Sequence, residues 1–211
     1  MNAHYPFVNP PLPYAYDALE PFIDTKTMHL HHDRHLQTYV DNLNKALKDH
    51  PDLHGWSLEE LIGRAGELPE DIRTTVWNNA GGVYNHILYF DGMSNSETRC
   101  YAGSLYTAIM EEFGSFDAFY DQFKSKALSV FGSGYAWLVM DQDGRLRIIS
   151  TANQDTPISL NMSPVLLIDV WEHAYYLKHY NERAAYIDDW FHVVDWEHAA
   201  ALYENAMQSI V

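Results

Sequence analysis

The sequence predicts an α+β fold, in which an N-terminal helical hairpin is followed by a C-terminal α/β part with a small antiparallel sheet of about three strands. The first half of the chain repeats apolar residues at three- and four-residue steps, as amphipathic helices do. In the second half, short β-branched and aromatic runs flank a turn sequence, as in a β-hairpin. We therefore expect a hairpin domain over residues 1–93 and an α+β domain over residues 94–211.

The opening of the chain is expected to be extended, with the first long helix following it. Five prolines between residues 5 and 23 cannot all lie in helices. The helical pattern then covers residues 25–47, with Asp24 or Thr25 as its N-cap. On this helix three residues at four-residue steps share one face: His31, His35 and Tyr39.

A second long helix is expected to pack against the first and complete the hairpin. A capped short helix over residues 57–62 leads to it, and Pro69 begins a helical stretch that ends near Phe90. Its middle contains Gly81 and Gly82, each of which costs about 1 kcal/mol of helix stability relative to alanine. Such a pair indicates that another part of the chain, or a site, approaches the helix closely.

The C-terminal half is expected to combine helices with three strands. Turn residues Asp141–Gly144 join the first two strands, and an apolar run supplies the third. Asp195 is the expected N-cap of the last helix. The expected helices cover residues 101–112, 116–130, 173–180 and 196–207, and the expected strands cover residues 135–140, 145–149 and 164–168.

Composition limits the classes of function. The formal charge is −16, from 13 basic and 29 acidic side chains, which argues against binding to nucleic acid or to an anionic membrane. The single cysteine, Cys100, excludes an intrachain disulfide and is expected to be a small buried side chain. Neither an export signal nor a membrane-spanning stretch is recognisable, so we expect a cytoplasmic protein.

The segment Asp169–Tyr176 suggests a metal site. Asp169 ends an apolar run and His173 follows four residues later, so the two side chains can meet at one point. A carboxylate and an imidazole together suit manganese, iron or zinc. The spacing alone is common, and Asp169 could equally cap the helix that contains His173.

Two further histidines could complete a ligand set. His31 on the first long helix and His86, which follows the paired glycines, are carried by separate rigid elements. Three imidazoles and one carboxylate between the two halves would leave room for a bound solvent molecule. Each histidine also has an ordinary explanation in packing or in contact with solvent, which the residue pattern leaves open.

Taken as a whole, Asp169–Tyr176 resembles the signature of the iron/manganese superoxide dismutases. The segments Leu12–Pro21, Thr27–Val40 and Asn78–His86 resemble the opening and the two long helices of the same family. The resemblance covers nearly the whole chain and implies four metal ligands: His31, His86, Asp169 and His173. It further implies that five residues surround these ligands: His35, Tyr39, Gln154, Trp137 and Trp171.

The activity implied by this resemblance is disproportionation of superoxide to dioxygen and hydrogen peroxide by redox cycling of a single bound metal ion. Tyr39, His35 and Gln154 would be the catalytic side chains beside the ligands. Gln154 lies in the C-terminal half, and Gly82 stands where iron enzymes usually carry this glutamine, so the chain resembles the manganese type. We expect manganese, with iron as the alternative metal or as a second usable one.

Two other functions fit the residues less well. A non-catalytic metal-binding protein on the same scaffold would need neither Tyr39 nor Gln154, and both are present. A metallohydrolase would need a free carboxylate base beside the metal, and none is recognisable in the sequence.

The resemblance also implies a homodimer, in which Glu172 reaches a ligand histidine of the partner subunit and Tyr176 meets the partner's His35. Pairing of dimers into a tetramer stays open. Arg34 and Arg183 are candidates for a locally positive entrance that attracts the superoxide anion despite the negative net charge. Five residues depart from the usual family pattern and bear on the aromatic wall and the metal preference: Phe90, Tyr135, Leu167, Ala184 and His192.

Overall fold

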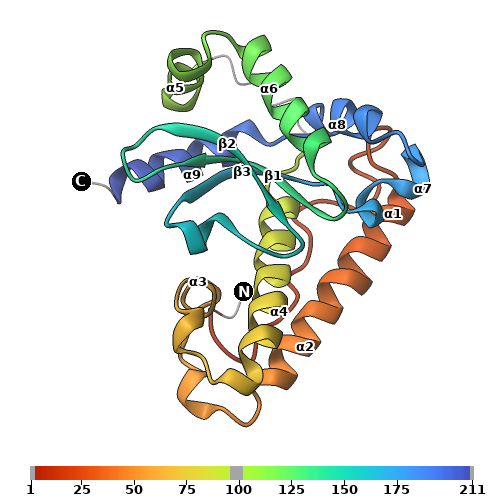
Figure 1. The fold of residues 1–211 in the computed structure, drawn as a ribbon. Coiled ribbons are helices and arrows are strands. Elements are labelled where there is room, and N and C mark those ends of the chain that lie inside the picture. Colours follow the sequence, from red (N-terminus) through yellow and green to blue (C-terminus); the bar gives the residue numbers. More distant parts are fainter. Residues whose placement is uncertain (1–2, 96–101, 210–211) are drawn as a thin grey trace.

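The computed structural model describes residues 3–95 and 102–209 and confirms the predicted α+β fold (Figure 1). Cys100, which was expected to be buried, lies outside the described residues. The division of the chain after residue 93 stays a prediction. Within the described residues, no helix is both long and apolar enough to cross a membrane.

The N-terminal part is the predicted helical hairpin. Its helices are α1 (Thr25–Leu30), η1 (His31–Leu36), α2 (Gln37–Leu47), η2 (Pro51–Leu53), α3 (Leu58–Gly63), η3 (Ala65–Glu67) and α4 (Glu70–Asp91). Helices α2 and α4 lie side by side (Figure 1), and both contribute buried apolar residues to one core that continues into the C-terminal part. Local capping follows the sequence: Asp24 caps α1, and Ser57 forms the predicted capping box with Glu60.

The first long helix departs from prediction in its middle. We expected one continuous α-helix over residues 25–47, but His31–Leu36 form a π-helix between α1 and α2. Short π segments within α-helices are rare and frequently occur at functional sites, because the wider turn redirects the side chains that it carries. This segment contains His31 and His35, two of the residues singled out above.

The C-terminal part contains the predicted three-stranded sheet. Its elements are α5 (Ser104–Phe113), α6 (Phe116–Ser129), β1 (Gly134–Met140), β2 (Leu146–Ala152), η4 (Pro157–Leu160), β3 (Ser163–Asp169), η5 (Glu172–Ala174), α7 (Tyr176–His179), α8 (Arg183–Phe191) and α9 (Trp196–Gln208). The strands are antiparallel in the order β2-β1-β3. Helix α6 packs on β1 and β2, and α9 packs on β3 (Figure 1).

The sheet and the hairpin meet where β3 ends. Every residue of β1 is buried, as expected for the central strand. Its register pairs Tyr135 with Asp169, the last residue of β3. Helix α4 packs against β3, so a side chain from α4 and one from the end of β3 can face the same point.

One prediction for the C-terminal helices was wrong, and one helix was not predicted. The helix expected over residues 173–180 is a 3-10 turn, η5, followed by the single turn α7, because Tyr175 between them has a non-helical backbone (φ −141°, ψ −16°). Helix α8 was not predicted. Its nine residues are fewer than the ten to twelve or so at which a periodic pattern becomes decisive.

Candidate metal centre

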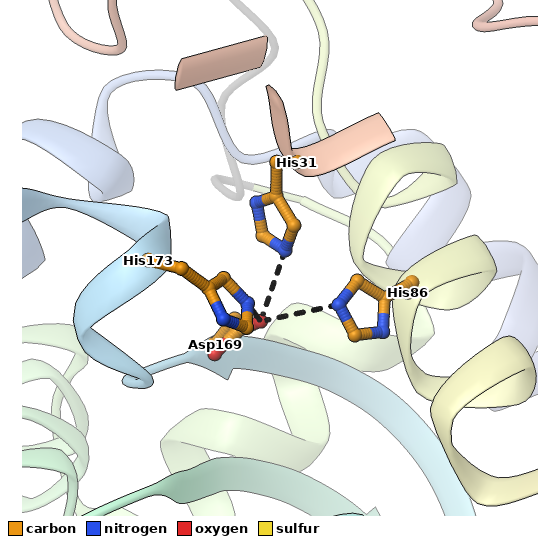
Figure 2. Close-up of side chains that lie close together, drawn as sticks. All are labelled: His31, His86, Asp169 and His173. Atoms are coloured by element: carbon orange, nitrogen blue, oxygen red, sulfur yellow. Dashed lines mark hydrogen bonds and ion pairs between the residues drawn. The ribbon is translucent and has the colours of Figure 1, made fainter. Parts of the chain in front are cut away.

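Four side chains from four elements gather at the junction of the two parts (Figure 2). His31 begins η1, His86 lies in α4, Asp169 ends β3 and His173 lies in η5. Each offers one ligand atom, and these atoms all lie within 4.8 Å of one another. Three of the side chains are buried and His173 is partly buried. The structure therefore brings together all four residues that the sequence singled out as candidate ligands.

The distances from the Asp169 carboxylate to the three imidazoles suit a shared metal ion. Asp169 Oδ2 lies 3.2 Å from His31 Nε2, 3.3 Å from His173 Nε2 and 3.9 Å from His86 Nε2. Ligand atoms bound to a transition metal at about 2.1 Å, with angles between 90° and 180°, lie about 3.0–4.2 Å apart. All three distances fall in that range.

The hydrogen bond of His86 leaves a lone pair facing this centre. Its Nδ1 lies 2.6 Å from the carbonyl oxygen of Gly82, which can only accept, so Nδ1 carries the ring proton. Nε2 is then unprotonated and points toward the Asp169 carboxylate (Figure 2). Neither His86 Nε2 nor His31 Nε2 has a hydrogen-bond partner among the described residues, although both are buried. A bound cation would satisfy both nitrogens and the carboxylate together, so these residues fit a metal ion.

The charge states of the cluster also suit metal binding. Burial lowers the pKa of His31 to about 4, and burial together with the neighbouring His31 lowers the pKa of His86 well below its ordinary value. Burial would raise the pKa of Asp169, but the imidazoles of His173 and His31 hold that pKa well below its usual range. At neutral pH, His31 and His86 are therefore neutral donors beside a carboxylate, the forms in which these groups bind metals.

Asp169 also caps the turn that follows it, the ordinary explanation that the sequence left open. Its Oδ1 accepts a hydrogen bond of 2.8 Å from the backbone N–H of Trp171. This leaves Oδ2 for the three imidazoles. The two interpretations are thus compatible, because each uses a different oxygen.

Gln154 lies at the centre of a hydrogen-bond network beside the cluster. Its Nε2 donates to the hydroxyl of Tyr39 (2.9 Å), and its Oε1 accepts from the hydroxyl of Tyr135 (2.9 Å) and from Nδ2 of Asn85 (3.3 Å). Two donors on Oε1 direct the amide nitrogen toward Tyr39. Sequence reasoning noted Tyr135 only as a departure and did not consider Asn85, although Asn85 directly precedes His86.

The paired glycines allow two of these residues to approach α4. A Cβ atom on Gly81 would lie 2.2 Å from the carbonyl oxygen of Gln154, and one on Gly82 would lie 2.4 Å from the ring of Tyr39. Real Cβ atoms do not approach other heavy atoms so closely. The close approach that the sequence predicted at this pair is therefore confirmed.

The remaining residues that were predicted to surround the ligands differ in whether they contact a candidate ligand. The half-buried His35 stacks on His173, with ring centroids 4.2 Å apart, and Trp171 stacks on the same ring at 5.4 Å. Trp137 packs against Tyr135, with centroids 5.7 Å apart, and its indole nitrogen donates to Thr151. His35 and Trp171 thus touch a candidate ligand, whereas Trp137 reaches the network through Tyr135.

The two arginines expected near an entrance have different surroundings. Arg34 is exposed. Arg183 is tied to the loop before β1, because its guanidinium donates to the carbonyls of Val130 (2.6 Å) and Gly132 (3.0 Å) and to the hydroxyl of Tyr175 (3.2 Å). Arg183 therefore has a structural role of its own.

Two protein-family models match the chain. The alpha-hairpin domain of iron/manganese superoxide dismutases matches residues 6–94, and the C-terminal domain of iron/manganese superoxide dismutases matches residues 101–202. The first match contains His31 and His86, and the second contains Asp169 and His173. Together the two matches cover most of the chain, and they contain all four residues of the cluster. The chain belongs to the iron/manganese superoxide dismutases, which are oxidoreductases.

Proposed function

We propose that this protein disproportionates superoxide to dioxygen and hydrogen peroxide at a metal ion held by His31, His86, Asp169 and His173. The observation that carries the proposal is the convergence of three imidazole nitrogens, two of them without a hydrogen-bond partner among the described residues, on one buried carboxylate oxygen in a chain of this family. When bound, the metal supplies a one-electron couple between its trivalent and divalent states, which zinc lacks.

The residues around the ligands would supply the protons that the reaction consumes. Reduction of superoxide to hydrogen peroxide consumes two protons, and the Tyr39 hydroxyl is a suitable donor within the network. Burial raises the pKa of Tyr39, so the phenol holds its proton at neutral pH. Gln154 holds this hydroxyl through its amide nitrogen at 2.9 Å. His35, stacked on His173, is the second proposed proton carrier beside the site.

We further propose manganese as the resident metal. The glutamine of the network comes from the segment after β2, and Gly82 contributes no side chain to the site. An amide directed at the metal-bound solvent changes the acidity of that solvent and the potential of the metal, so its position favours one metal over another. Activity with iron is the alternative outcome of the test below.

A homodimer is proposed from the side chains exposed near the site. Glu172 and Tyr176 are exposed beside the candidate ligand His173. Helices α1 and α7 are in contact, and Arg183 links the loop that carries Phe131 to Tyr175. These elements expose several large apolar side chains: Leu30, Phe131, Tyr176, Leu177 and Tyr180. A grouped set of exposed apolar residues is typical of a protein-binding surface, and a second copy of the chain is the proposed partner.

The test compares superoxide decay by protein loaded separately with manganese, iron and zinc. Stopped-flow absorbance at high superoxide concentration measures the reaction directly, and the zinc form controls for effects of the fold and of metal binding alone. Fast decay with manganese and none with zinc is expected. Comparable decay with iron would overturn the proposed preference for manganese over iron. No decay with either redox metal would overturn the proposed reaction.

A further inference from the structure

Two buried tyrosines link the helix of His86 to the backbone of Asp169. The Tyr186 hydroxyl donates to the carbonyl oxygen of Asp169 at 2.8 Å, and the hydroxyls of Tyr89 and Tyr186 lie 2.9 Å apart. Both side chains are buried, with exposures of 1% and 0%. Each phenol has one proton, and that of Tyr186 is used by the carbonyl. Tyr89 is therefore the donor in the pair, which gives a directed chain of two hydrogen bonds.

This chain connects elements that are distant in the sequence. Tyr89 lies in α4, Tyr186 in α8 and Asp169 at the end of β3 (Figure 1). Tyr89 follows His86 by three residues, so both lie on one side of α4. Its ring also contacts that of His31, with centroids 5.3 Å apart. One side chain thus touches one candidate ligand, shares a helix turn with a second and is hydrogen-bonded through Tyr186 to a third.

We propose that Tyr89 and Tyr186 are positioning residues, which set the distance between the Asp169 carboxylate and the two imidazoles supplied by the N-terminal part. This inference rests on the proposed ligand role of Asp169. The Asp169 side chain is held at Oδ1 by Trp171, so its remaining freedom is displacement of its own backbone. Tyr186 fixes that backbone at the carbonyl, and Tyr89 ties Tyr186 to α4. Ligands held in this way bind a metal more tightly because less reorganisation accompanies binding.

Substitution by phenylalanine removes the hydroxyls and keeps both rings. Tyr186→Phe removes both hydrogen bonds of the chain, because the Tyr186 hydroxyl donates to Asp169 and accepts from Tyr89, whereas Tyr89→Phe removes only the bond to Tyr186. We expect manganese to dissociate about tenfold faster from Tyr186→Phe, since partners of metal ligands typically change affinity by 10–100-fold. A smaller acceleration is expected for Tyr89→Phe. The matched control is Tyr14→Phe, which removes a hydroxyl that donates to the Phe90 carbonyl on the same helix at 2.9 Å.

Two readouts separate positioning from general stabilisation. The first is the gain in Tm on loading with manganese, measured against the metal-free form of each variant. The second is the EPR spectrum of bound Mn²⁺, which reports ligand geometry without any turnover. If Tyr186 positions Asp169, Tyr186→Phe should gain less Tm on loading than the wild type and should show an altered EPR spectrum. Tyr14→Phe should match the wild type in both.

The outcomes against the inference are distinct from those against the proposed function. Equal falls in Tm for the metal-free and loaded forms, with unchanged metal release and EPR spectrum, would overturn the inference alone. A wild-type protein that retains neither manganese nor iron would overturn the proposed function and this inference with it. If Tyr186→Phe does not fold, the same measurements on Tyr89→Phe decide between these outcomes.

Discussion

Replacing Gly82 by alanine is predicted to displace Tyr39 while leaving the ligands in place. The added methyl group would lie 2.4 Å from the Tyr39 ring. Carbon atoms in contact lie about 3.5–4.0 Å apart, so the ring must move by about 1 Å or more. The Tyr39 hydroxyl is 2.9 Å from Gln154 Nε2, and a shift of this size away from Gln154 takes the pair beyond hydrogen-bond distance.

The expected effects differ for stability, metal content and rate. Overpacking of this kind costs about 1–3 kcal/mol. In a protein of this size that corresponds to a fall in Tm of about 2–12 °C. Metal content is expected to stay at the wild-type level, because the hydrogen bond from His86 Nδ1 goes to the backbone carbonyl of Gly82, which alanine also has. Turnover is expected to fall by up to about 100-fold, as a misplacement of about 1 Å can cause.

The assay is stopped-flow decay of superoxide with Tm and metal content measured on the same preparation. Gly66→Ala is the control, since no heavy atom lies within 4 Å of a Cβ at that position. It is expected to behave as the wild type. If Gly82→Ala kept both wild-type Tm and wild-type turnover, the packing argument for Tyr39 would be refuted.

Substitutions at three further residues test the surroundings of the ligands and the proposed interface. Tyr39→Phe is predicted to keep the metal but slow turnover at high superoxide, where proton supply limits the rate; unchanged kinetics there would exclude Tyr39 as the donor. Tyr135→Phe removes a donor to Gln154 and is predicted to shift the visible spectrum of the loaded protein, whereas Tyr135→Trp, which keeps an N–H donor, restores it. Identical spectra for all forms would contradict this role. Glu172→Ala is predicted to weaken the proposed dimer, which analytical ultracentrifugation measures; an unaltered sedimentation profile would remove Glu172 from the proposed interface.

Local patterns in the sequence predicted most of the fold. Asp24, Ser57 and Asp195 cap the helices to which the sequence assigned them, because each cap is a contact within two or three residues. The three strands were located by their apolar, β-branched and aromatic runs and by the turn residues between the first two, and each observed strand differs from its predicted bounds by a few residues at most. The four clustered residues were found because their motifs are specific to one family.

The features that escaped prediction depend on contacts distant in the sequence. The π segment at His31–Leu36 has no pattern that distinguishes it from an α-helix. The hydrogen bond between Tyr135 and Gln154 depends on the position of the chain after β2 relative to β1. The link from Tyr89 to Tyr186 spans 97 residues and requires side chains from α4 and α8 to meet. Such contacts are fixed by tertiary packing, which a single sequence does not display.

The central claim is that His31, His86, Asp169 and His173 hold one redox-active metal ion. Its most direct test is bound manganese per chain, measured by mass spectrometry together with superoxide decay, for the wild type and His86→Ala. The control is His4→Ala, which removes an exposed histidine. We predict one manganese per chain and fast decay for the wild type and the control, and loss of both for His86→Ala. Full metal content and wild-type decay in His86→Ala would contradict the claim.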